Sequence, residues 1–76
     1  MAWRRVYWVE VAFTRPSKPL LEMLSSAYEV RLKSSNGMAI LLGPFSTREE
    51  AERVAGEVCG KRCVLGVNVV PGGVLE

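Results

Sequence analysis

Hydrophobic and polar positions change period along the chain, and each period predicts an element. Residues 6–13 are mostly β-branched or aromatic, which predicts a strand. Residues 28–33 alternate between apolar and polar side chains, which is typical of a strand with one buried face. Two further apolar runs predict the remaining strands, one over residues 38–42, ended by Gly43-Pro44, and one over residues 63–70.

Two segments between these strands have the spacing of helices. Ser17 precedes the first helix, which is predicted over residues 18–27. Ser46 caps the second helix, Glu49 three residues later completes a capping box, and Gly60 ends the helix. The second helix carries one apolar stripe with spacings of three and four, which consists of Ala51, Val54, Ala55, Val58 and Cys59.

The order of these elements is strand, helix, strand, strand, helix, strand, which predicts an α+β domain. Right-handed crossovers place both helices on one face of a four-stranded antiparallel sheet, which is the ferredoxin-like arrangement. Asn36-Gly37 indicates a hairpin turn over residues 34–37, between the second and third strands. We expect a single domain over residues 1–76, with a core over residues 6–70 and a short, loose tail over residues 71–76.

The helices cover one face of this sheet and leave the other, the open face, to solvent or to a partner. Alternation assigns these residues to the covered face: Val9, Val11, Phe13, Tyr28, Val30, Leu32, Ile40, Leu42, Leu65, Val67 and Val69. It assigns these residues to the open face: Val6, Trp8, Glu10, Glu29, Arg31, Lys33, Ala39, Leu41, Val64, Asn68 and Val70. We expect an apolar patch at Val6, Trp8, Leu41 and Val70. Such a patch marks an interface, although single apolar side chains are also ordinary on protein surfaces.

Composition narrows the chemistry that the chain can perform. Its 76 residues include ten Lys and Arg against eight acidic residues, all of them Glu, and they contain no His, Asp or Gln. Without His or Asp, one chain cannot assemble a Ser-His-Asp or Cys-His nucleophile. Two Cys without any His also cannot close a structural zinc site. We therefore expect a protein that is not an enzyme and that uses no metal and no cofactor.

Half of the basic residues are expected at one end of the sheet. This basic pole consists of Arg15, Lys18, Lys33, Lys61 and Arg62. A cluster of this kind suits phosphates and other anions, so RNA or single-stranded DNA is one class of partner to consider. The alternative is a solvated surface, in which Lys61 and Arg62 follow the second helix and favour its dipole.

The cysteines and the lengths of the apolar runs indicate the cellular compartment in which the protein is expected. Cys59 and Cys63 are expected to be small buried side chains, with a local disulfide as the alternative. No run approaches the roughly 20 apolar residues that span a bilayer. Glu10 also interrupts the apolar stretch that a signal peptide would need, so a complete chain is expected to be soluble and cytoplasmic. The scarcity of Asn and the absence of Gln are typical of a thermophilic protein.

One segment is more specific than the general pattern. Residues 42–51 run through Gly43-Pro44-Phe45 into a capped helix, and they resemble the hallmark of SPOR domains. The segment Val9-Glu10-Val11-Ala12 loosely resembles the opening Val-Gln-Val-Gly of that family, with Glu10 in the place of Gln. The resemblance implies the ferredoxin-like fold over residues 6–70 and binding of peptidoglycan glycan strands on the open face. An excised SPOR domain would belong to the cell envelope.

The function expected from this sequence is that of a non-catalytic binding or assembly module. The candidate ligand or interface residues on the open face are Trp8, Glu10, Arg31, Lys33, Leu41 and Asn68. Trp8 is expected to stack on a sugar ring. A homo-oligomer joined through the same face is the alternative. RNA-recognition motifs share the order of elements, but Met38 and Ile40 stand on the third strand where those domains have aromatic side chains.

Overall fold

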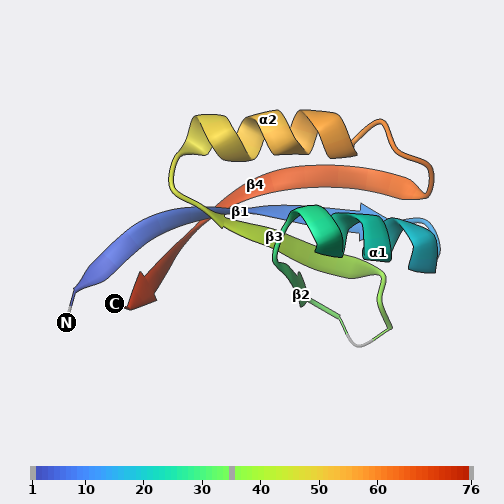
Figure 1. Ribbon diagram of the computed structural model, residues 1–76, viewed down its shortest axis with the longest axis horizontal. Helices are drawn as coiled ribbons and strands as arrows, with labels where there is room; N and C mark the ends of the chain where they lie inside the picture. Colours follow the sequence, from blue (N-terminus) through green and yellow to red (C-terminus); the bar gives the residue numbers. More distant parts are fainter. Residues whose placement is uncertain (1, 35, 76) are drawn as a thin grey trace.

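The computed structural model describes residues 2–34 and 36–75, and its element order is the one that the sequence predicts (Figure 1). The elements are β1 (Trp3–Phe13), α1 (Lys18–Ala27), β2 (Val30–Leu32), β3 (Ala39–Phe45), α2 (Arg48–Val58) and β4 (Val64–Leu75). The strands form one antiparallel sheet in the order β2-β3-β1-β4. The predicted ferredoxin-like α+β fold is confirmed.

The main core lies between the sheet and the two helices. Leu24 of α1 and Ala51 and Val58 of α2 are buried against the same face of the sheet. The strand residues of this cluster come from β1 and β3, and they are Val9, Val11, Phe13, Ile40, Leu42 and Phe45. Removal of these apolar side chains from water is the main force that holds the helices on the sheet.

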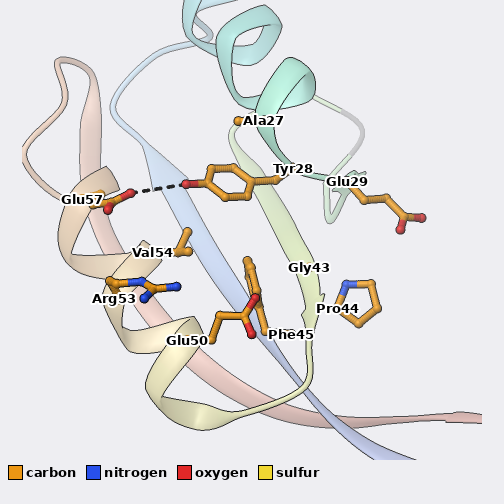
Figure 2. A pocket seen from close by; sticks show the side chains of 10 residues that line it. All are labelled: Ala27, Tyr28, Glu29, Gly43, Pro44, Phe45, Glu50, Arg53, Val54 and Glu57. Carbon is orange, nitrogen blue, oxygen red and sulfur yellow. Dashed lines mark hydrogen bonds between the residues drawn. The ribbon is translucent and has the colours of Figure 1, made fainter.

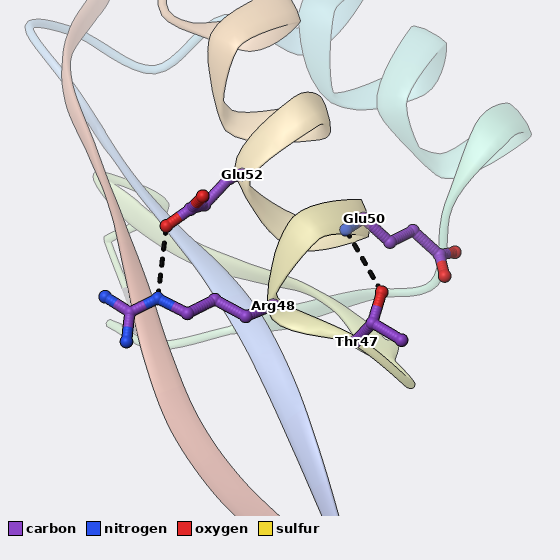
Figure 3. Close-up of polar contacts among 4 residues, drawn as sticks. All are labelled: Thr47, Arg48, Glu50 and Glu52. Carbon is purple, nitrogen blue, oxygen red and sulfur yellow. Dashed lines mark hydrogen bonds and ion pairs between the residues drawn. The ribbon is translucent and has the colours of Figure 1, made fainter.

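Both helices begin within one residue of the predicted position. Ser17 is the N-cap of α1, as expected. The N-cap of α2 is Thr47 rather than Ser46, and its hydroxyl accepts a hydrogen bond from the backbone N–H of Glu50 at 3.2 Å (Figure 3). Because serine and threonine are both good capping residues, the sequence does not distinguish Ser46 from Thr47 by residue type.

β1 and β4 are longer than the sequence predicts. β1 begins at Trp3, and β4 continues to Leu75. The predicted loose tail after residue 70 is wrong, because residues 71–75 pair with residues 3–7 of β1. This two-stranded part of the sheet extends past the beginning of α2, away from the body of the domain (Figure 1).

β2 is shorter than predicted. The strand covers residues 30–32, with backbone hydrogen bonds of Glu29 and Lys33 to β3 on either side, whereas it is expected over residues 28–33. Tyr28 instead caps the end of α1, where its backbone N–H donates to the carbonyl of Leu24 at 2.8 Å. This position directs the Tyr28 side chain toward α2 rather than along the sheet (Figure 2).

A side-chain hydrogen bond of Asn36 and the backbone conformation of Gly37 shape the turn between β2 and β3. Its predicted span includes Ser35, which lies outside the described residues. The Asn36 side chain accepts a hydrogen bond from the backbone N–H of Met38 at 3.0 Å, and Gly37 has a φ of +74°. Both features are those that an Asn-Gly turn predicts.

An irregularity in the strand pairing moves side chains away from their predicted faces. Between its pairs with Phe13 and Ala12 of β1, β4 contributes one extra residue. As a result, Val64 packs against the core and Leu65 is 72% exposed, so the predicted faces of these two residues are wrong. Leu32 is also predicted to be covered, but on the short edge strand β2 it is 65% exposed.

Candidate functional site: the open face of the sheet

Four of the predicted site residues form one row across the open face. Arg31 of β2 lies opposite Leu41 of β3, and Glu10 of β1 lies opposite the same leucine. Asn68 of β4 in turn lies opposite Glu10. Because neighbouring strands are about 4.8 Å apart, the row spans about 14 Å. It combines a guanidinium, a carboxylate and an amide with one apolar side chain.

Trp8 lies beside this row but is not an exposed stacking surface. Its side chain is only 9% exposed. The Cζ atom of Arg31 lies 5.2 Å from the centroid of the indole ring, which is a cation–π arrangement. The indole therefore supports Arg31 in this structure, and a sugar ring could stack on the same side of Trp8 only if Arg31 moved away.

Two glycines allow the indole to lie close to the sheet. A Cβ atom on Gly72 would lie 2.9 Å from Nε1 of Trp8, and one on Gly43 would lie 3.1 Å from Cε3 of Trp8. Gly43 also has a φ of +140°, a conformation that residues with side chains rarely adopt. The glycine of the Gly43-Pro44-Phe45 segment thus has a local role, since it lets β3 approach Trp8.

The predicted apolar patch is mostly covered. Val6 is fully buried and Trp8 is nearly so, whereas Leu41 and Val70 are half-buried. Val6 and Trp8 lie outside the main core cluster. Both side chains approach Gly72, where an added Cβ would lie 3.9 Å from Val6. They therefore form a small second cluster beneath the open face.

Lys33, which is predicted both on the open face and in the basic pole, is engaged on the open face. Its ammonium forms an ion pair with the carboxylate of Glu10. The Glu10 side chain is partly buried, whereas the Lys33 side chain is more exposed. Since Glu10 occupies the middle of the cross-strand row, this ion pair orients the carboxylate that a ligand would meet there.

Among the other residues of the basic pole, Arg15 contacts Cys63. Arg15 Nε–H donates a hydrogen bond to the Sγ atom of Cys63 at 3.3 Å. This hydrogen bond, together with the electrostatic interaction with Cys63, raises the pKa of Arg15 above its usual value. The other members are exposed, and they are Lys18, Lys61 and Arg62. The hydrogen bond to Cys63 thus places Arg15 beside the start of β4, and the basic pole as an anion site stays a prediction.

The two cysteines are not fully buried apolar side chains, so that prediction is wrong. Both thiols are free; Cys59 is exposed and Cys63 is half-buried. The thiol of Cys59 donates to the carbonyl of Gly56 at 3.4 Å. The local disulfide that the sequence left open is not formed.

A groove of about 730 Å³ lies on the helix side of the sheet, between α2 and the end of β3. The residues that line this helix-side groove are Ala27, Tyr28, Glu29, Gly43, Pro44, Phe45, Glu50, Arg53, Val54 and Glu57. Figure 2 shows Arg53 and Glu50 directed into it from α2, with Phe45 behind them. This groove is not among the features predicted from the sequence. The feature of the sequence that indicates the groove is the spacing of Glu50, Arg53 and Glu57, which places three charged side chains on one face of α2.

Tyr28 bridges the two helices at one end of the helix-side groove. Its hydroxyl donates to Oε2 of Glu57 at 3.3 Å (Figure 2), and its ring meets that of Phe45 edge to face, with 6.1 Å between the centroids. Burial raises the pKa of the Tyr28 phenol above 10.0, and the Glu57 carboxylate raises it further, whereas Arg53 acts in the opposite direction. Tyr28 therefore remains a protonated donor at neutral pH.

No protein-family model, curated protein or solved structure matches this chain. Within residues 2–34 and 36–75, no group of three or more acidic or cysteine side chains is arranged to hold a metal ion. In the same part of the chain, no helix combines the length and the apolar character needed to cross a membrane. The proposed function therefore depends on the geometry of the open face and on the residues that form it.

Proposed function

We propose that the protein is a non-catalytic binding module, similar to SPOR domains, that binds an extended glycan strand on its open face. The observation that carries this proposal is the cross-strand row formed by Arg31, Leu41, Glu10 and Asn68. A row that crosses all four strands fits a long, narrow ligand better than a compact one.

The chemistry of the row suits a chain rich in hydroxyl groups. The Arg31 guanidinium donates hydrogen bonds, the Glu10 carboxylate accepts them, and the Asn68 amide does both. Each sugar hydroxyl can likewise donate and accept. Leu41 lies between the charged groups and offers an apolar surface to the C–H groups of a sugar ring. Binding of this kind needs no change in covalent bonds.

The resemblance to SPOR domains supports the same face. Gly43 of the Gly43-Pro44-Phe45 segment admits Trp8, and Trp8 in turn supports Arg31 at one end of the row. The segment that carries the resemblance is thus physically connected to the surface proposed to bind the glycan. Where the family has Gln, Glu10 would contact the ligand through a carboxylate instead of an amide.

The other functions considered have less support. A homo-oligomer joined through the open face would need exposed apolar side chains at Val6 and Trp8, and both are buried. Stacking of RNA or single-stranded DNA bases would need aromatic side chains on the open face of the first and third strands. Tyr7 instead packs against the main core, and Ile40 is fully buried there.

Co-sedimentation with purified peptidoglycan sacculi tests this proposal. We expect the wild type to sediment with the sacculi, and Arg31→Ala and Asn68→Ala each to weaken binding by about tenfold, because each removes hydrogen bonds to the ligand. Arg62→Ala is the matched control, since it removes an exposed cation from the basic pole. No sedimentation of the wild type, or an equal loss with Arg62→Ala, would contradict the proposal. Trp8→Ala is unsuitable because it deletes a buried side chain.

A further inference from the structure

The outer edge of β4 is exposed in a way that natural sheets usually avoid. β4 is the last strand of the sheet, and no described residue forms a strand beside it. It is 12 residues long, whereas β2 at the other edge has three. Short strands, charged side chains and prolines usually protect such edges. β2 carries Arg31 at its centre, but β4 contains no charged residue, and Pro71 alone interrupts its edge.

Alternate residues of β4 direct their backbone N–H and C=O groups outward. The N–H of Phe13 donates to the carbonyl of Met38 on the β3 side at 2.8 Å. Odd-numbered residues of β1 therefore bond toward β3, and their partners in β4 direct their polar groups away from β1. These outward residues are Val67, Val69, Pro71, Gly73 and Leu75. At this position the missing N–H of Pro71 removes no hydrogen bond to β1.

We propose that two copies of the chain associate through β4, with the two strands antiparallel about a two-fold axis at Val70. This register places outward residues opposite outward residues: Val67 lies opposite Gly73 of the second copy, and Val69 lies opposite Pro71. Each Val67–Gly73 pair can share two backbone hydrogen bonds. Each Val69–Pro71 pair can share one, because proline has no N–H. The result is a continuous eight-stranded sheet with an isologous interface.

The side chains of β4 favour a second copy over an unrelated strand. In the register centred on Val70, this residue faces its own copy at the axis, and Val67 and Val69 face Gly73 and Pro71, so that apolar residues and glycine meet along most of residues 67–73. A strand without charged residues also opposes no like charges when it pairs with itself.

This association leaves the open face accessible. A two-fold axis perpendicular to the sheet places the helices of both copies on one side and both open faces on the other. The β4 dimer is therefore compatible with a ligand on the open face, and it does not depend on one. A dimer joined face to face would instead cover Arg31 and Asn68.

Cysteine cross-linking tests the register directly. In a Cys59→Ser, Cys63→Ser background, Val70→Cys places two thiols opposite each other at the two-fold axis. In this register even-numbered residues form the pairs without hydrogen bonds, whose Cα atoms lie about 4.5 Å apart, within the range of a disulfide. We expect Val70→Cys to form a covalent dimer under mild oxidation. Asn68→Cys is the matched control, because it lies opposite Gly72 of the second copy.

Introducing a charge at residue 70 provides a second test. We expect the wild type to sediment as a dimer at equilibrium, and Val70→Lys and Val70→Glu each to weaken self-association at least tenfold, because like charges then face each other at the axis. An equal mixture of the two variants is expected to recover the dimer, with circular dichroism confirming that each is folded. A wild type that stays monomeric, a mixture that does not recover, or Asn68→Cys that cross-links as readily as Val70→Cys would overturn the proposal.

Discussion

The guanidinium of Arg31 lies over the indole of Trp8, with 5.2 Å between Cζ and the ring centroid. The two residues come from strands that are not neighbours, since β3 lies between β2 and β1. The contact therefore reaches across β3 and covers an indole that two glycines, one on β3 and one on β4, hold against the sheet. The contact therefore stabilises the small cluster of Val6 and Trp8, and it also fixes the position of Arg31 in the cross-strand row.

Arg31→Ala is expected to expose Trp8 and to lower the free energy of unfolding by about 0.5–1 kcal/mol, which is the usual strength of an exposed cation–π contact. The change can be followed by Trp8 fluorescence in a Trp3→Phe background, because Trp3 is highly exposed and would otherwise dominate the signal. Loss of the covering guanidinium should shift the emission to longer wavelength. Arg53→Ala, on α2, is the control, and an emission maximum that does not move with Arg31→Ala would contradict the role assigned to the contact.

Gly72→Ala is expected to destabilise the fold by about 1–3 kcal/mol, because the new methyl group would lie 2.9 Å from Nε1 of Trp8. Gly66→Ala on the same strand is the matched control, since an added Cβ there meets nothing within 4 Å. We expect Gly66→Ala to change stability by less than about 0.5 kcal/mol. Urea denaturation measures both.

A double-mutant cycle identifies the partner of the Gly72 methyl group. In a Trp8→Leu background, Gly72→Ala should lower the free energy of unfolding clearly less than it does in the wild type, because the smaller side chain leaves room for the methyl group. If the cost is the same in both backgrounds, the effect comes from the backbone of β4 and not from the indole.

The sequence predicts those features of the fold that follow from local rules. Ser17 and the apolar spacing after it place α1 correctly, because a cap and a periodic stripe act within a few residues. The alternation of residues 28–33 also places Arg31 on the open face, and counting alternate residues along β1 places Glu10 there. The strand order follows from the handedness of the crossovers, which is nearly invariant.

Features that depend on contacts between distant segments are not predicted. The burial of Trp8 requires glycines at positions 43 and 72, on two different strands, and neither glycine signals an aromatic neighbour in its own segment. The extra residue in β4 breaks the alternation at Leu65, so Val64 and Leu65 exchange their predicted faces while Val67 and Val69 keep theirs. Pro71 suggests the end of a strand, yet at an outer edge it costs no hydrogen bond and the strand continues.

Thr47→Ala is expected to lower the free energy of unfolding by about 1 kcal/mol, because its hydroxyl accepts the hydrogen bond from the Glu50 N–H that caps α2 (Figure 3). Ser46→Ala removes the hydroxyl that the sequence predicts as the cap, and we expect it to change stability by only a few tenths of a kcal/mol. Chemical denaturation of the two variants separates the two positions. A larger loss with Ser46→Ala than with Thr47→Ala would place the cap at residue 46 instead.

Stability at alkaline pH is expected to depend on Tyr28. Burial, followed by the charge and hydrogen bond of Glu57, raises the pKa of this phenol above 10.0 in the folded protein. As pH rises, the Tyr28 phenol therefore loses its proton in the unfolded chain before it does so in the folded protein. The contribution of Tyr28 to the free energy of unfolding is fully present below about pH 10 and is lost as pH rises through the folded pKa. Between about pH 9.5 and 11, urea denaturation should show a steeper fall in the free energy of unfolding for the wild type than for Tyr28→Phe.

Glu57→Gln separates the two causes of the raised Tyr28 pKa. The amide keeps an oxygen that can accept the hydrogen bond from the Tyr28 hydroxyl but removes the negative charge that opposes ionisation of the phenol. Titration of phenolate absorbance, taken as the difference between a protein and its Tyr28→Phe counterpart, should then give a lower pKa for Tyr28 in the Glu57→Gln variant than in the wild type. Burial still acts in that variant, so its pKa should remain above that of an unfolded tyrosine. An identical pKa in both proteins would mean that the carboxylate of Glu57 does not act on Tyr28.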